Sequence, residues 1–433
     1  MVKIKAFKGI TYNSTKIRSL DTVMSPPYDI ISESMQETLY NNSPYNFVRL
    51  ILGKQKPSDN QNDNRYTRSK EFYEQWLQEK ILVQSDTPAL FPYEISYESS
   101  GLQKTMSGFF TLLKLDPSYK SVKAHERTLS KPKADRLDLM RATHSNLEPI
   151  QLLYIDQEGA IQSLINQAQT KPIISVTGYD GFTHTLFKLT KKSVIESIVE
   201  KLSDQNLFIA DGHHRYQTAI NYAEEMKKKT KNDDPDAPFN YQMVILVNMF
   251  DKGLDILPTH RLIKMPQLNR DDFLDKLQKY FTIESQPVIK SEHNESYAHT
   301  LVQSISTETK HAFIMYFSDM YYILRLKNIA AMDSLASDHS KTWRTLDVSI
   351  LHKIILESIM GINESNIEDH VKYTREDSEA LSKVDSGEFT CSFLMNPTKI
   401  DELKAIADGG EHMPQKSTYF LPKMLSGLVM YKM

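Results

Sequence analysis

The segment that reads FIADGHHRYQTA, from Phe208 to Ala219, constrains the fold of this chain most strongly. The apolar run 207–210 is long enough for a buried strand. An Asp-Gly pair ends that run, because glycine adopts backbone angles that other residues resist. Apolar residues then recur at helical spacing, at Tyr216, Ala219, Ile220 and Ala223. The segment therefore predicts a strand, a tight turn and a helix.

The predicted turn gathers groups that bind anions. A helix beginning near His213 would direct unpaired backbone N–H groups at the turn, and its dipole would favour negative charge. We therefore expect Gly212, His213, His214 and Arg215 to bind phosphate, with the Arg215 guanidinium as a planar donor. Asp211 ends the strand and is the candidate to bind a metal ion or to orient a hydroxyl group. The alternative is structural: the aspartate caps the helix and the histidines lie on the surface.

The length of 433 residues exceeds what one compact core usually holds and predicts more than one domain. A boundary is expected near Pro266, because acidic residues that favour a helix N-terminus follow it, at 271–272. The predicted domains are residues 1–265 and 266–433. The composition, 40% hydrophobic and 25% charged, is that of an ordinary globular protein.

The net charge, the cysteine content and the N-terminal segment limit the classes of protein to which this chain can belong. A net charge of −3 argues against a chain whose main partner is a nucleic acid. The single cysteine, Cys391, fits a reducing compartment. Lysines interrupt the N-terminal segment where a signal peptide would be apolar, and no window is long and apolar enough to span a bilayer. We therefore expect a cytoplasmic protein with no membrane partner.

Periodicity predicts further elements along the chain. Strands are expected at 47–52, 150–155, 185–189, 243–247 and 390–395, and hairpins at 89–97 with 105–115 and at 312–317 with 320–326. Helices are expected at 65–80, 135–140, 194–202, 268–272 onward, 348–359 and 399–407. The charged stretch 226–238 is expected to be a solvated loop.

Several motifs, in their order along the chain, resemble the domain-of-unknown-function 1015 family. After Ser25-Pro26-Pro27-Tyr28-Asp29 come HERT at 125–128, KADR at 133–136, the DGHHRY turn, PTHR at 258–261 and MPQKSTYF at 413–420. The turn also resembles the phosphate-binding box of the ParB/sulfiredoxin superfamily. The resemblance implies an α+β fold, with a ParB/sulfiredoxin-like nucleotide-binding region at 1–265 and a mixed α/β domain at 266–433.

The resemblance also implies an activity. Characterised relatives are kinases that convert free L-serine to O-phospho-L-serine with ATP or ADP and Mg²⁺. Their general base is a carboxylate in an N-terminal loop, so Asp29 is the candidate here, one methylene shorter than their glutamate. Glu126 is the competing base. Arg127, Thr128 and Arg136 are candidates for binding the acceptor. The alternative for Asp29 is that it caps a helix that starts at 30 or 32.

Two other functions stay open at the level of the sequence. One is a nucleotide-binding or nucleotide-hydrolysing regulatory switch of the ParB type. The other is a DNA-binding ParB relative, which the acidic balance and the lack of a clear helix-turn-helix disfavour. The oligomeric state is open too, with a homodimer as the candidate assembly.

Overall fold

The computed structural model describes residues 1–99, 101–125, 130–168, 170–289, 294–306, 308 and 311–433. They divide into two compact units. The first is formed by residues of 1–124, 130–255 and 422–433, and the second by His125 and 256–421. The division thus falls after Asp255 rather than near Pro266, and the chain returns to the first unit for its last twelve residues, 422–433.

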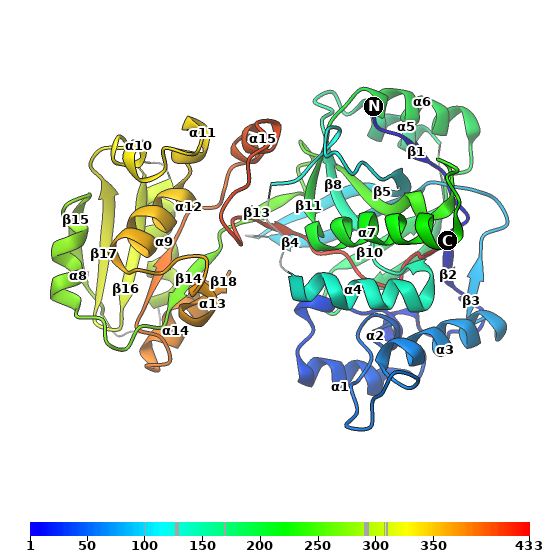
Figure 1. The fold of residues 1–433 in the computed structure, drawn as a ribbon, viewed down its shortest axis with the longest axis horizontal. Coiled ribbons are helices and arrows are strands. Elements are labelled where there is room, and N and C mark those ends of the chain that lie inside the picture. The colour runs from blue at the N-terminus through cyan, green and yellow to red at the C-terminus, as the bar shows by residue number, and fades with distance from the viewer. Residues whose placement is uncertain (100, 126–129, 169, 290–293, 307, 309–310) are drawn as a thin grey trace. The chain divides into compact units, whose positions relative to one another are not determined.

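The first unit is built on a nine-stranded sheet with the order β6-β11-β8-β12-β5-β4-β10-β9, to which β1 adds beside β5. Figure 1 shows this sheet with helices α5, α6 and α7 packed around it. The elements, in chain order, are β1 (Ile4–Lys5), β2 (Ile10–Tyr12), η1 (Leu20–Thr22), η2 (Tyr28–Ile30), α1 (Glu33–Asn42), α2 (Val48–Ile51), α3 (Arg65–Gln78), β3 (Leu82–Gln84), β4 (Phe91–Ser99), β5 (Leu102–Lys114), β6 (Val122–Lys123), α4 (Ser130–Thr143), β7 (Ser145–Asn146), β8 (Ile150–Tyr154), α5 (Ala160–Gln167), β9 (Pro172–Thr177), β10 (Thr183–Phe187), α6 (Lys192–Ser203), β11 (Leu207–Asp211), α7 (His213–Thr230), η3 (Pro238–Asn240), β12 (Tyr241–Asn248) and β21 (Tyr431–Lys432).

The strand, turn and helix expected around Gly212 are confirmed as β11 and α7. Strand β11 runs antiparallel to β8, and a register shift before Asp211 places that residue opposite Gln151. Such an irregularity re-aims a side chain at the end of a strand. The hairpin expected at 89–115 is confirmed as β4 and β5.

Apolar side chains of the sheet and three helices form the main core of the first unit. Alternate residues of β8, Ile150, Leu152 and Tyr154, contact Ile161 of α5 and Ile198 of α6 in this core. Alternation puts every second strand residue on one face, so Gln151 lies on the other face. Helix α7 joins the core as well, which fixes the direction of its N-terminus.

Two local predictions in the first unit were wrong. The run 47–52 forms the short helix α2 instead of a strand, because four to six apolar residues fit a buried helical turn as well as a strand. Helix α7 continues to Thr230 through lysines expected in a loop. Lysines at 227–229 lie in its last turn, where the helix dipole favours positive charge.

The second unit holds a six-stranded sheet with the order β15-β17-β16-β19-β14-β18, and β13 pairs with β20. Its elements are β13 (Asp255–Leu257), which begins at the division, β14 (His260–Ile263), α8 (Arg270–Leu277), β15 (Phe281–Pro287), α9 (Asn294–Ser306), β16 (Ala312–Phe317), β17 (Met320–Leu326), α10 (Ala331–Leu335), α11 (Lys341–Arg344), α12 (Asp347–Ile350), the π-helix η4 (Leu351–Ile359), α13 (Ile367–His370), β18 (Val371–Thr374), α14 (Asp377–Asp385), β19 (Cys391–Leu394), α15 (Ile400–Asp408) and β20 (Tyr419–Leu421).

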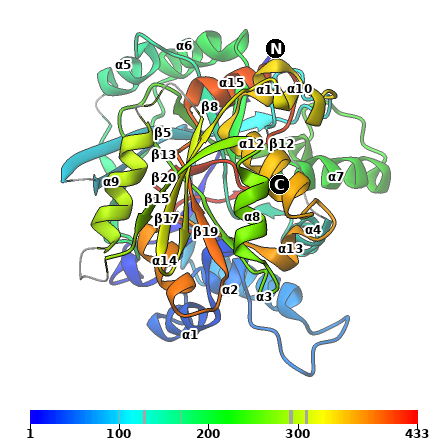
Figure 2. The same cartoon turned by 90° about the vertical axis from the view of Figure 1, so that its left-hand side faces the viewer.

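Helices α9 and α14 pack on one face of the second sheet, where they share a core with Ile314 and Tyr321 (Figure 2). Tyr322 alternates to the opposite face, where its hydroxyl accepts a hydrogen bond from Arg270 Nε of α8 at 3.0 Å. The expected hairpin is confirmed as β16 and β17. Together the two units confirm a mixed α+β fold. In the part of the chain that the structure describes, no helix combines the length and apolar character needed to cross a bilayer.

The C-terminal segment 422–433 attaches to the first unit along its length. Isolated bridges pair Ser25 with Ser426 and Ile10 with Met430. Gly427 has φ +103°, and a Cβ atom there would lie 3.1 Å from the ring of Phe47. Only glycine fits both the backbone conformation and the space.

Gly427→Ala is therefore expected to destabilise the first unit by about 1–2 kcal/mol from the left-handed backbone and by about 1–3 kcal/mol more from overpacking. The control Gly181→Ala shares a positive φ but meets open space, so it carries only the backbone cost. Urea unfolding followed by Trp76 fluorescence, in a Trp343→Phe background, reports on the first unit alone. Equal losses for the two variants would contradict the packing argument.

Candidate functional site

Helix α7 begins without a side-chain cap from its N-cap residue. Gly212 is the N-cap with φ +95°, and no side chain caps the first turn at that position. A Cβ atom on Gly212 would lie 3.1 Å from Nε of Arg215, so glycine also lets that side chain fold back across the turn. The helix has 18 residues, so the dipole of a long helix adds positive potential at this N-terminus, next to the N–H groups of the first turn.

The carboxylate of Asp211 lies between two cations. Its Oδ2 accepts from Arg215 at 2.6 Å and its Oδ1 from Lys423 at 3.0 Å. Burial by itself would raise the pKa of Asp211, but Lys423, Arg215 and His213 outweigh it and hold the pKa well below its usual range. A carboxylate of such low pKa is a weak base. Two cations, Lys423 and Arg215, thus lie beside the start of α7.

Arg215 links this turn to the loop that carries Asp29. Its guanidinium donates to the carbonyl of Pro149 and to Asp211. Burial lowers the pKa of Arg215, but the carboxylates of Asp211, Glu148 and Asp29 outweigh burial, so the pKa is raised. Asp29 is thus within electrostatic reach of the turn.

Asp29 is exposed in the short helix η2. It does not cap the next helix, because Ser32 does: its hydroxyl accepts from the backbone N–H of Met35 at 3.2 Å. The capping alternative for Asp29 is therefore excluded.

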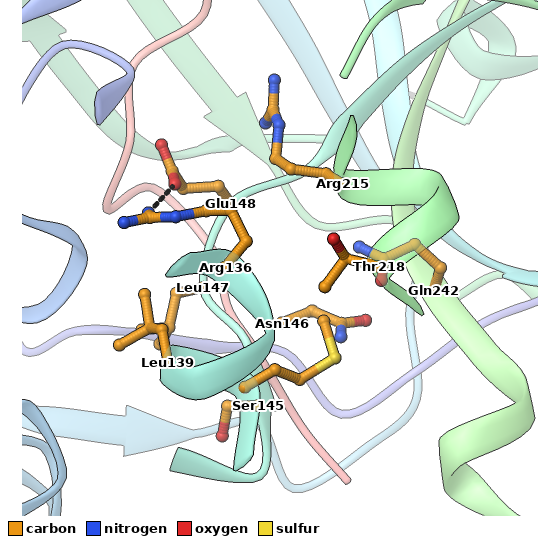
Figure 3. Close-up of a pocket in the computed structure, with 10 residues that line it drawn as sticks. Arg136, Leu139, Ser145, Asn146, Leu147, Glu148, Arg215, Thr218 and Gln242 are labelled. Carbon is orange, nitrogen blue, oxygen red and sulfur yellow. Dashed lines mark hydrogen bonds and ion pairs between the residues drawn. The ribbon is translucent and has the colours of Figure 1, made fainter. Parts of the chain in front are cut away.

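A buried glutamate, Glu148, ties together the segments that surround the turn. It is 6% exposed and accepts from the N–H of Tyr28 at 3.2 Å, from Ser426 Oγ at 3.1 Å and from Arg136 at 3.3 Å. Figure 3 shows the Arg136–Glu148 pair with Arg215 nearby. Burial raises the pKa of Glu148, although Arg215 and Arg136 act in the opposite direction.

The guanidinium of Arg136 is bound by several other groups of the protein. Its Nε donates to Asp135 at 2.8 Å, and its Nη2 donates to the carbonyl of Ile51 at 2.9 Å. The guanidinium lies 3.9 Å from the ring centre of Tyr28. The cavity beside Arg136, Glu148 and Arg215 is only about 40 Å³, room for about one water. These contacts favour a structural role for Arg136 over binding of an acceptor.

The predicted site residues fall into three groups. The structure brings Asp211, Gly212 and Arg215 together at the turn, with His213 buried and His214 half-buried in the first turn of α7. Charge interactions connect Asp29 and Arg136 to this turn through Arg215 and Glu148. The third group, Glu126, Arg127 and Thr128, lies outside the described residues.

Three further residues near the turn were not predicted from the sequence. Lys423 and Glu148 reach it through distant segments, and no local pattern marks them. Gln151 is fully buried opposite Asp211, and neither of its amide atoms has a hydrogen-bond partner among the described residues. A glutamine inside the apolar strand 150–154 is the one signal that the sequence offered.

A metal ion finds a poor set of ligands here. Among the described residues, no group of three or more His, Cys, Asp or Glu side chains is arranged to hold one. Mg²⁺ is often bound by one or two carboxylates plus substrate phosphates. Asp211, however, is bonded through both oxygens to cations that would repel Mg²⁺. The residues present do not fit the expected metal site at Asp211.

The contacts of Glu148 predict a large stability effect. Glu148→Gln removes the buried negative charge and one of the two carboxylates that pair with Arg136, so we expect a loss of about 3–5 kcal/mol. Unfolding of the first unit, followed by Trp76 fluorescence in the Trp343→Phe background, measures this. Glu196→Gln, an exposed glutamate on α6, is the matched control and should change little. A small effect of Glu148→Gln would rule out the buried carboxylate as a structural anchor.

Comparison with solved structures gives distant likenesses. A free serine kinase in complex with AMP is 12% identical, with a TM-score of 0.34, and the match covers 74% of this chain and 92% of that one. SbnI with C-terminal truncation from Staphylococcus aureus is 13% identical, with a TM-score of 0.35, over 73% of this chain and 85% of that one. At these values the likenesses define neither substrate nor mechanism.

The search of curated proteins finds no match. A family model does match, described as a protein of unknown function, DUF1015, and it covers residues 4–349. That match spans most of the chain, including the turn at Gly212 and the loop at Asp29. The chain therefore belongs to the DUF1015 family.

Proposed function

We propose that this protein is a small-molecule kinase that transfers a phosphoryl group from ATP or ADP to free L-serine. The observation that carries the proposal is the pairing of a cationic helix N-terminus with a nearby exposed carboxylate, Asp29. L-serine as the acceptor rests on the resemblance of the motifs to serine kinases. The ParB/sulfiredoxin-like character proposed for residues 1–265 rests on the resemblance of the DGHHRY turn to the phosphate-binding box of that superfamily.

The phosphate groups of the nucleotide would bind at the start of α7. Backbone N–H groups in the first turn of a helix face its N-terminal end, and Lys423 and Arg215 add two positive charges beside that end of α7. His213 and His214 lie in the same turn. In phosphoryl transfer, most of the rate comes from positioning and from stabilising charge on the transferred group. This turn provides charge stabilisation without a Gly-rich Walker loop.

Asp29 is the proposed general base. The serine hydroxyl oxygen forms a bond to the terminal phosphorus while the bond from that phosphorus to the bridging nucleotide oxygen breaks. The hydroxyl proton passes to Asp29, and ADP leaves when ATP is the donor, or AMP when ADP is the donor. Asp211 is a poorer base because of its low pKa, so it is assigned the role of holding Lys423 and Arg215 in place.

No step of this proposal passes through a metal ion bound by the protein, because the side chains at Asp211 do not fit one. Any Mg²⁺ that takes part would arrive with the nucleotide phosphates. Glu126 as a competing base, and Arg127 and Thr128 as acceptor ligands, remain proposals from the sequence. A homodimer is likewise a proposal.

The nucleotide site is tested through Lys423. Lys423→Met removes one of the two cations, so we expect the dissociation constant for ADP and ATP to rise at least about tenfold by isothermal titration calorimetry. Lys432→Met, in the same C-terminal segment but with an exposed side chain, is the control. Unchanged affinity in Lys423→Met would place the phosphates elsewhere.

The chemistry is tested through Asp29. Phosphorus NMR should detect O-phosphoserine when the protein is incubated with L-serine, Mg²⁺ and either nucleotide. Asp29→Asn should lower kcat by about 10²–10⁴-fold with little change in the KM for nucleotide, because a general base acts on the proton and not on the phosphates. Asp29→Glu should retain activity.

Glu33→Gln, an exposed carboxylate in the first turn of α1, is the matched control for Asp29→Asn and should be fully active. Nucleotide binding without any phosphorylated product, from serine or other small alcohols, would reject the kinase. Nucleotide-dependent assembly in the ultracentrifuge would then favour the regulatory switch.

A further inference from the structure

A second cavity lies wholly within the unit formed by 256–421. Its volume is about 210 Å³, several times the share of volume of one water in the liquid. It is bounded by the start of β14, the end of α9, the first residues of α12 and α15, and the loop after β19. It involves none of the residues of the phosphate site.

The first set of lining residues comprises the cation Arg261 and two residues, Thr259 and Asn396, with an oxygen that has no hydrogen-bond partner among the described residues. Arg261 is 1% exposed, and its guanidinium donates to the sulfur of Met395 at 3.2 Å and to the carbonyl of Lys416 at 3.3 Å. Thr259 is 7% exposed, and its Oγ1 has no hydrogen-bond partner among the described residues. The same holds for Oδ1 of Asn396. Buried polar atoms are normally paired, so these two oxygens are suited to hydrogen-bond a molecule in the cavity.

The other charged lining groups are carboxylates. Asp347 bonds to His311 at 2.7 Å, and Glu308 forms an ion pair with Arg325 at 2.8 Å. Glu402 accepts the backbone N–H of Lys399 at 2.8 Å, and no ion pair of its side chain is found in the described part of the chain. Burial and the nearby Asp347 raise the pKa of Glu402. An ammonium group would relieve this unfavourable burial of negative charge.

We infer that this cavity is a binding site for a free α-amino acid, separate from the phosphate site. The ligand carboxylate would be held by Arg261 and the hydroxyl of Thr259. Its ammonium group would be held by Glu402, with Oδ1 of Asn396 accepting one N–H. A zwitterion would contact both kinds of lining group, whereas an anion or a cation alone would contact only one of them.

The size of the cavity limits the ligand further. Sites for drug-sized molecules measure about 300–1,000 Å³. A cavity of 210 Å³ is below that range and suits a molecule of amino-acid size rather than a nucleotide. Among described residues no metal-ligand cluster occurs, so the carboxylates are not explained as a cation cage.

The test is calorimetric titration of the full chain with each of the twenty common L-amino acids. At least one should bind. For that amino acid, the amine without the carboxylate and the acid without the amine should both bind at least about tenfold more weakly, since each loses one charge-assisted contact.

Substitutions of residues that line the cavity test whether the amino acid binds there. Thr259→Val removes one hydroxyl at constant volume and should weaken binding about tenfold, and Glu402→Gln should do so by a similar factor. Thr259→Ser should restore binding. Thr342→Val, on the exposed face of α11, is the matched control. Thr259→Val also removes a buried oxygen, Oγ1, that has no hydrogen-bond partner among the described residues. The midpoint for unfolding of the second unit should therefore stay the same or rise. This measurement distinguishes a loss of binding from a loss of folding.

The inference is independent of the proposed kinase. Asp29→Asn and Lys423→Met should leave this binding unchanged even where they abolish phosphoryl transfer. Absence of heat with every amino acid at millimolar concentration would overturn the inference. So would binding that is insensitive to both Thr259→Val and Glu402→Gln, or binding that Asp29→Asn removes.

Discussion

The buried carboxylate of Glu148 is the interaction on which the candidate site depends. It accepts hydrogen bonds from three segments that are far apart in the chain, through Tyr28, Arg136 and Ser426. Those segments carry the Asp29 loop, helix α4 and the C-terminal residues that bring in Lys423. A charge at 6% exposure is costly unless it is paired and hydrogen-bonded, so the three segments must meet around it. The position of the site follows from this requirement.

The distribution of charge then separates the roles of the acidic residues. Asp211 is surrounded by Lys423, Arg215 and His213, which keep its pKa low and make it a fixed counter-ion. Asp29 is exposed, and its charge helps to raise the pKa of Arg215, so it lies within electrostatic range of that guanidinium. Two carboxylates with such different surroundings are suited to different tasks.

The sequence predicted the local elements well where a periodic pattern was long. The hairpin β4–β5, helix α3 and the strand–turn–helix at Gly212 follow from alternation, helical spacing and one glycine. It failed at 47–52, because a short apolar run fits a buried helix as well as a strand and only packing decides. The domain boundary differed because the pairing of β14 with β18 and β19 is set by long-range contacts.

The sequence by itself determined the strand–turn–helix that brings Asp211, Gly212 and Arg215 together, since these residues lie within five positions and the backbone turns at the glycine. Tertiary structure alone decided what surrounds the turn. Lys423 is 212 positions away from Asp211 and Glu148 is 120 positions from Tyr28, so no pattern along the chain could connect them. Burial forces such pairings, because an ionic group removed from water must find its partner wherever the fold supplies one.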